Sequence, residues 1–350
     1  MDPMGSPGNC HDGVVSTAIQ QIISRQEERM KGNLSVLGSL LAAACLVGSA
    51  GHATAQDFPN KPIRIVVANS AGSIADLAAR TLGQEMSKTL GQPIIVEAKP
   101  GANQLIGLDF VHKQPADGHT LILTYITALA ALPTMVKSLN FDPLKDFPPI
   151  TTVFRIRVYL TTPRKQPWSN FEQFAAYAKA NPGRLNFGSN NVPVRLIFES
   201  MFGQLGVNLV HVPFTGAGPL IQALATDQIQ IVLTNEQYLN TFKEQIQPIA
   251  ITGTLRDPKY PNLPTLTELG FPQMRDADYM LNIRSGTPQP IVDRLYNAAV
   301  QALRTPEVRA AYTKMQFEPV GNSTQDAAKA FADEAASYTA VARKLGLQPQ

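Results

Sequence analysis

Cysteine is almost missing from this sequence: the 350-residue chain contains two, Cys10 and Cys45. Both precede residue 56, so the rest of the chain cannot form a disulfide, present a thiol nucleophile or build a thiolate–metal centre. No cluster of histidine or carboxylate residues has the spacing of metal ligands either. We therefore expect neither a metal nor a cofactor.

A large excess of one charge is also missing. The chain has 30 basic and 27 acidic residues, for a net charge of +3, and its basic residues are scattered. This balance argues against nucleic-acid binding and remains compatible with a small anionic ligand. The 44% hydrophobic and 16% charged content is typical of a globular protein, and the length allows two domains.

Long hydrophobic runs are absent after residue 55. The one uncharged apolar run covers residues 34–50, follows Met30-Lys31 and precedes Ala53-Thr54-Ala55, a small-x-small cleavage pattern. We predict that residues 30–55 are a signal peptide cut after Ala55, and that residues 1–29 are a non-native or disordered extension. No later segment is long enough to span a membrane, so a periplasmic location is expected.

The first unit of the remaining chain predicts a strand, a loop of small residues and a helix. Residues 63–67 are a β-branched run, and apolar residues from 75 to 82 have helical spacing. A helix N-terminus with free backbone N–H groups suits a carboxylate. The alternative is that Ser73 and Asp76 only form a capping box. The candidate residues of this loop are Ser70, Ala71, Gly72, Ser73 and Asp76.

Similar small, polar loops follow several later strands, and this repetition favours a binding site. Strands alternating with helices predict a parallel sheet, in which ligands bind beyond the carboxyl ends of the strands. A strand over residues 120–124 is expected to lead into a loop at residues 125–127. The further candidate residues are Tyr125, Thr127, Ser189, Asn190, Asn191, Thr215, Gly216, Ala217 and Asn235.

The order of these units predicts an α/β protein with two lobes, a hinge and a ligand cleft between the lobes. A Pro-rich passage at residues 142–149 precedes a strand-like crossing at 153–161, and residues 278–283 are expected to return the chain. Helices over residues 290–304 and 326–344 are expected to pack on the first lobe. The predicted lobes are residues 57–155 with 283–350, and residues 156–282.

Several strings, in order and spacing, resemble the solute-binding (Bug) receptors of tripartite tricarboxylate transporters. They are KPIRIVV, PGANQLIG, DGHTLIL, FDPLKDF, YAKANPGRLNFGS, HVPFTGAG, LPTLTELGFP and TPEVRAA. The resemblance implies a type II periplasmic binding protein fold and delivery of a small organic anion to membrane permease subunits. It also implies that one ligand carboxylate lies between residues 68–76 and 189–191. We expect a monomer.

The chain departs from the family pattern in both loops. Residues 70–73 replace a Pro-Pro-Gly-Gly type sequence, and the second loop is followed by Arg195. We hypothesise that Arg195 pairs with a second ligand carboxylate, although it could be a solvated surface residue. Arg157 and Arg284 are either ligand contacts or partners of hinge and surface acids. Tyr279 either stacks on a ligand ring or lies in the core.

Other chemistry has weaker support. Ser70 lies in a near match to a hydrolase nucleophile elbow, but no histidine is placed as its base, and His211 is expected to lie in the core. Asp227 and the acids of residues 326–334 are interpreted as solvated helix faces. We predict a binding protein without enzymatic activity. A sensor subunit of a signalling system remains an alternative, and aliphatic and aromatic carboxylates, acidic amino acids and nicotinate-like acids remain possible ligands.

Overall fold

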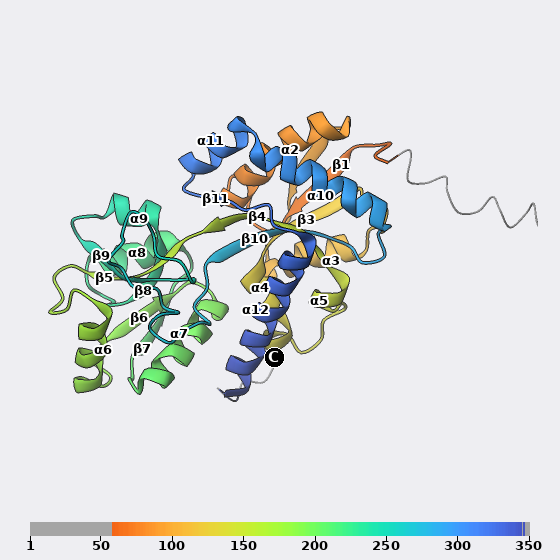
Figure 1. Cartoon of the computed structure of the whole chain (residues 1–350). Helices are drawn as coiled ribbons and strands as arrows, with labels where there is room; N and C mark the ends of the chain where they lie inside the picture. Colours follow the sequence, from red (N-terminus) through yellow and green to blue (C-terminus); the bar gives the residue numbers. More distant parts are fainter. Residues whose placement is uncertain (1–57, 345, 347–350) are drawn as a thin grey trace, which may run out of the picture. The chain divides into compact units, whose positions relative to one another are not determined.

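The main sheet has six strands in the order β11-β4-β10-β3-β1-β2 (Figure 1). β2 and β3 pair with β1 in parallel, whereas β10 is antiparallel to both β3 and β4. The predicted parallel pairing is confirmed for the first three strands. The strand expected to return the chain is also confirmed, because β10 runs antiparallel to both of its neighbours. The strands are β1 (Ile63–Val67), β2 (Ile94–Ala98), β3 (Thr120–Tyr125), β4 (Pro149–Ile156), β10 (Ala277–Ile283) and β11 (Glu318–Pro319).

The computed structural model describes residues 58–344 and residue 346. The predicted extension, signal peptide and cleavage site, together with both cysteines, lie outside the described residues. Among the described residues, no helix combines the length and the apolar character needed to cross a membrane.

Two smaller sheets are formed by the chain between β4 and β10. β5 (Val158–Pro163) lies between β8 (Val232–Asn235) and β9 (Ile246–Ile251) and is antiparallel to both. β6 (Asn186–Ser189) and β7 (Val210–Pro213) form a parallel pair. The predicted crossing at residues 153–161 is two strands, because β4 ends at Ile156 in the main sheet and β5 begins at Val158 in the three-stranded sheet.

The helices that precede β5 or follow β10 accompany the main sheet. The two predicted C-terminal helices are confirmed: α10 contacts α2, and α12 runs alongside α4 (Figure 1). These helices are α2 (Ile74–Leu90), η1 (Ala102–Gln104), α3 (Leu105–His112), α4 (Ile126–Met135), α5 (Pro143–Asp146), α10 (Gln289–Arg304), α11 (Pro306–Lys314) and α12 (Thr324–Lys344). The smaller sheets carry α6 (Phe171–Ala180), α7 (Val192–Leu205), α8 (Ala217–Ala225) and α9 (Glu236–Thr241).

The segment expected as a loop at residues 125–127 is mostly helical, which corrects that prediction. Tyr125 ends β3, and α4 begins at the next residue without a side-chain cap. Ile126, Leu129 and Ala130 are buried at helical spacing, so tertiary burial stabilises a helix start that has no local capping signal. Thr127 therefore projects from the first turn of a helix.

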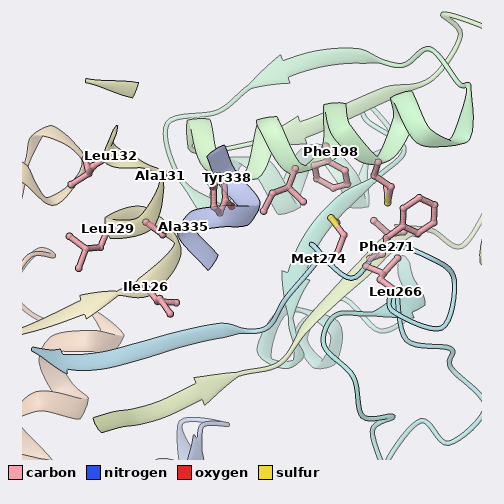
Figure 2. Packing of buried hydrophobic residues seen from close by; sticks show 14 of the residues in the cluster. Ile126, Leu129, Ala131, Leu132, Phe198, Leu266, Phe271, Met274, Ala335 and Tyr338 are labelled. Carbon is pink, nitrogen blue, oxygen red and sulfur yellow. The ribbon is translucent and has the colours of Figure 1, made fainter. Parts of the chain in front are cut away.

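A continuous apolar cluster joins the helices of the main sheet to α7. Figure 2 shows Tyr338 of α12 between α4, which carries Leu129 and Ala131, and α7, which carries Phe198. The Tyr338 side chain is almost fully buried. Because this cluster includes residues of α4, α7 and α12, it packs these three helices against one another.

Candidate functional site

Two adjoining cavities are lined by residues from both the main sheet and the smaller sheets. The first, here called the loop chamber, has a volume of about 430 Å³ and includes Asn69, Ser70, Gln104 and Asn191 in its lining. The second, here called the apolar chamber, has a volume of about 230 Å³. The residues that line both chambers are Tyr125, Asn190 and Tyr279.

The loop chamber is built from the segments that follow β1, β2 and β6. Among the described residues, its lining carries amide and hydroxyl groups and no charged side chain. Gln104 is 7% exposed, and the side-chain oxygens of Gln104 and Asn69 are buried without a hydrogen-bond partner among the described residues. Because an amide can present either its oxygen or its nitrogen, both side chains can meet a polar ligand. Gln104 was not among the residues expected from the sequence, whereas Asn69 lies within the loop of residues 68–76 that the family resemblance implied.

The first loop is held by its own acidic residue. Ser73 caps α2, since its Oγ accepts from the Asp76 amide at 3.3 Å, as a capping box predicts. Asp76 is 2% exposed and accepts from the Gly72 amide at 3.0 Å and from Arg80. Burial disfavours ionisation, but the bonds from Arg80 and Gly72 outweigh it and lower the Asp76 pKa. The carboxylate therefore stabilises the turn.

The second loop is held by side-chain caps of the same kind. Asn191 Oδ1 accepts from the Val194 amide at 2.9 Å, which caps α7, and Asn191 Nδ2 donates to Asn190 Oδ1 at 3.0 Å. Ser189 is buried, and its Oγ lies 2.8 Å from His211 Nε2. His211 is half-buried, and burial together with the nearby Arg195 charge lowers its pKa. Ser189 thus anchors the start of the loop through its contact with His211.

The apolar chamber is enclosed by side chains of α7, α8 and the β4–β5 junction, among them Ile156, Ile197 and Leu220. Its charged lining residues are Arg275 and Glu334, which form an ion pair with Nε and Oε2 3.5 Å apart. Other polar groups in its lining include those of Thr127, Thr234, Asn235 and Tyr238.

Glu334 corrects the expectation that residues 326–334 form a solvated acidic face. It is 3% exposed, and its Oε1 accepts from Thr127 Oγ1 at 2.7 Å. Burial raises the Glu334 pKa, while Thr127 and Arg275 limit the rise. No local signal marks Glu334, because its neighbours Lys329 and Asp333 form an exposed helical ion pair typical of a surface.

Tyr279 forms the wall where the chambers meet. Its ring stacks on Phe154 with centroids 4.6 Å apart, and on Tyr125 at 5.4 Å. It is 8% exposed, and burial raises its pKa to about 12. The ring is therefore part of the aromatic core, and its remaining surface faces both cavities.

The structure brings together only some of the residues expected from the sequence. Ser70, Asn190 and Asn191 line the loop chamber, and Tyr125, Thr127, Asn190, Ala217 and Asn235 line the apolar chamber. The lining of these two chambers does not include Ala71, Gly72, Ser73, Asp76, Ser189, Arg195, Thr215 or Gly216.

The three arginines considered as ligand contacts have protein partners. Arg195 is half-exposed and pairs with Glu199 at 2.6 Å, one helical turn along α7. Arg157 pairs with Glu318 at 3.2 Å, and Arg284 donates to the Gln114 carbonyl. None of the three lines either chamber. Within residues 58–344 and 346, no group of three or more His, Cys, Asp or Glu side chains could hold a metal ion.

The sheets and the chambers between their loops define an α/β periplasmic binding protein fold. Residues 78–347 match the model of the tripartite tricarboxylate transporter family receptor, and the chain belongs to this family. A curated relative from Cupriavidus necator, "UPF0065 protein in gbd 5'region", is 31% identical and covers 89% of this chain and 95% of its own. Membership of a receptor family confirms the prediction that this chain is not an enzyme.

Two solved structures extend the comparison to bound ligands. A Rhodopseudomonas palustris protein solved with adipate is 26% identical, with a TM-score of 0.69 over 84% of this chain and 100% of its own. MatC from Rhodopseudomonas palustris, solved with malate, is 29% identical, with a TM-score of 0.66 over 81% of this chain and 100% of its own.

Proposed function

We propose that this receptor captures a small carboxylate between two lobes and delivers it to the permease subunits of a tripartite transporter. The lobes are residues 57–155 with 283–350, and residues 156–282. The chain acts in the periplasm as a monomer after removal of residues 1–55. The adipate and malate bound by the two related proteins support a carboxylate as the ligand class.

The observation that carries the proposal is the uncharged polar lining of the loop chamber. Ser70 follows β1, whereas Asn190 and Asn191 follow β6, so an anion between them contacts both proposed lobes. Hydrogen bonds from neutral donors to a charged acceptor are stronger than bonds between neutral groups. Ala71, Gly72, Ser73 and Ser189 are proposed to shape or complete this end of the site when the lobes close.

The hinge is proposed to lie at the two strands that connect the lobes. β4 and β5 are separated only by Arg157, and β10 returns beside β4. A rotation at these short connections would change the distance between Ser70 and Asn190 without breaking either sheet. Ligand binding is therefore expected to favour the closed arrangement.

A thermal-shift and calorimetric screen with aliphatic and aromatic mono-, di- and tricarboxylates tests the proposal. A true ligand at about 100 times its Kd should stabilise the protein by about 2.7 kcal/mol. Asn190→Ala should weaken binding about 10-fold or more, since it removes a contact to a charged group at an exposed position. Asn208→Ala, at an exposed position outside both chambers, is the matched control.

If no carboxylate raises the unfolding midpoint, the proposed ligand class is wrong. Binding that is equally strong in the Asn190→Ala variant would instead contradict the proposed position of the carboxylate. Delivery is tested separately, by asking whether the ligand-loaded receptor binds membrane vesicles that contain the permease more tightly than the free receptor does.

A further inference from the structure

The charges around the two chambers limit what the far end of the ligand can be. Among the described residues that line them, the only cation is Arg275 and the only acid is Glu334, and these two are paired with each other. A second ligand carboxylate in the apolar chamber would therefore lie beside the Glu334 carboxylate, and Arg275 would have to be shared. Burying an incompletely paired carboxylate is costly.

Other arginines near the strand crossings line neither chamber and are paired with acidic residues of the protein. Arg155 makes a two-bond contact with Asp278, at 2.7 and 2.8 Å, and Arg157 pairs with Glu318. Arg195 pairs with Glu199 and lies outside both linings. Recruiting any of them to a second ligand carboxylate would require breaking an existing ion pair.

The apolar chamber offers a neutral hydrogen-bonding group instead. Thr234 is 6% exposed, lines the chamber, and its Oγ1 is buried without a hydrogen-bond partner among the described residues. A buried hydroxyl that lacks a partner gains from a ligand group that can donate to it or accept from it. The neighbouring lining is supplied by Leu233, Ile197 and Leu220, which suit an apolar ligand body.

We infer that the ligand is an elongated monocarboxylate whose apolar body passes the Tyr125–Tyr279 wall and whose far end carries an uncharged hydrogen-bonding group for Thr234. This inference rests on the proposed carboxylate-binding function and narrows it. The carboxylate lies in the loop chamber, the body fills the apolar chamber, and the end group is a hydroxyl or an amide. A second carboxylate is selected against by Glu334.

Two matched ligand sets test the inference by calorimetry on the purified chain. The aliphatic set is 6-hydroxyhexanoate, hexanoate and adipate. The aromatic set is 4-(hydroxymethyl)benzoate, 4-methylbenzoate and terephthalate. In at least one set, the hydroxyl-terminated acid is expected to bind about 10-fold more tightly than the dicarboxylate and about 5-fold more tightly than the methyl-terminated acid.

Thr234→Val removes the hydroxyl and keeps the shape of the side chain. It should weaken binding of the hydroxyl-terminated acid about 5-fold and leave the methyl-terminated acid unchanged. Thr313→Val, on the exposed face of α11, is the matched control. Glu334→Gln keeps an acceptor for Thr127 and leaves the Arg275 charge without its acidic partner. The preference for the hydroxyl-terminated acid over the dicarboxylate should therefore fall at least several-fold.

The possible failures are distinguishable. If the dicarboxylate binds more tightly than its hydroxyl-terminated partner in both sets, the inference is overturned while the carboxylate receptor stands. The same follows if Thr234→Val weakens all ligands equally. If no member of either set binds, the carboxylate-binding proposal fails and the inference fails with it.

Discussion

The loop chamber and the apolar chamber differ in the groups that they present to the proposed ligand. In the first, loops that immediately follow strands present uncharged amides and hydroxyls, and the Asn191 cap of α7 helps to position the second loop. In the second, side chains from helices and strand ends surround the cavity, and the described charged residues in its lining, Arg275 and Glu334, are paired with each other. Under the proposed function, one end of the ligand is held for its charge, and the other for its shape and for a neutral hydrogen bond to Thr234.

The largest effect is expected at the wall between the two chambers. Tyr279→Ala removes a ring that stacks on both Phe154 and Tyr125, and should lower the free energy of unfolding by about 3–5 kcal/mol. Tyr279→Phe retains the ring and should cost about 1 kcal/mol or less. Urea unfolding of both variants measures the difference. Equal losses would show that the hydroxyl, rather than the stack, stabilises the wall.

A pH effect on stability is expected from Asp276, which follows Arg275 of the apolar chamber in the sequence. Burial raises its pKa to about 6, with Asp278 adding to the shift while Thr252, Arg155 and Arg157 oppose it. Because the folded form holds the proton more tightly than the unfolded chain, stability is highest below about pH 4 for this group and is lost as the pH rises through about 6. The loss is about 3 kcal/mol.

Asp276→Asn isolates this contribution, since an amide oxygen can still accept from Thr252 Oγ1, which lies 2.6 Å from the carboxylate. Unfolding free energies measured between pH 4 and pH 7 should fall less in the variant than in the parent protein. An unchanged pH dependence would mean that the Asp276 pKa does not differ between the folded and unfolded protein.

A smaller effect is expected from glycine substitution in the loop chamber. Gly101 lines this chamber with φ of 125°, and an added methyl group would lie 2.6 Å from Cδ1 of Ile106. Gly101→Ala should therefore cost about 1–3 kcal/mol and weaken carboxylate binding.

The control for Gly101→Ala is Gly203→Ala, which lies inside α7 with open space around its added methyl group. This change should stabilise the protein by up to about 1 kcal/mol. Thermal unfolding tests both predictions, because the midpoint should fall for Gly101→Ala and rise for Gly203→Ala. A Gly101→Ala variant that is as stable as the parent protein and binds normally would show that the loop chamber does not depend on this turn.

The residues predicted from the sequence reach both chambers: Ser70, Tyr125, Asn190 and Asn191 line the loop chamber, and Tyr125, Thr127, Asn190, Ala217 and Asn235 line the apolar chamber. The apolar run of β1, the capping serine of α2 and the asparagine cap of α7 are local signals, so Ser70, Asn190 and Asn191 were expected near a ligand. Gln104 was missed because its φ of 75° depends on the fold of the turn around it.

The apolar chamber depends on contacts between distant parts of the chain. Thr127 and Glu334 are 207 positions apart, and the exposed charges around Glu334 conceal its burial. Likewise, Arg195 has the residue type and position of a ligand contact, yet its partner Glu199 is one turn away on the same helix. The sequence predicts which groups exist, whereas packing decides which of them remain unpaired.

The position of each end of a bound ligand would decide whether the two chambers divide the ligand in this way. A crystal structure with 6-bromohexanoate would locate the far end by the anomalous signal of bromine. We expect a bromine peak in the apolar chamber beside Thr234 and Leu233, with the carboxylate between Ser70 and Asn190. A bromine peak in the loop chamber, or a carboxylate paired with Arg275, would contradict this expectation.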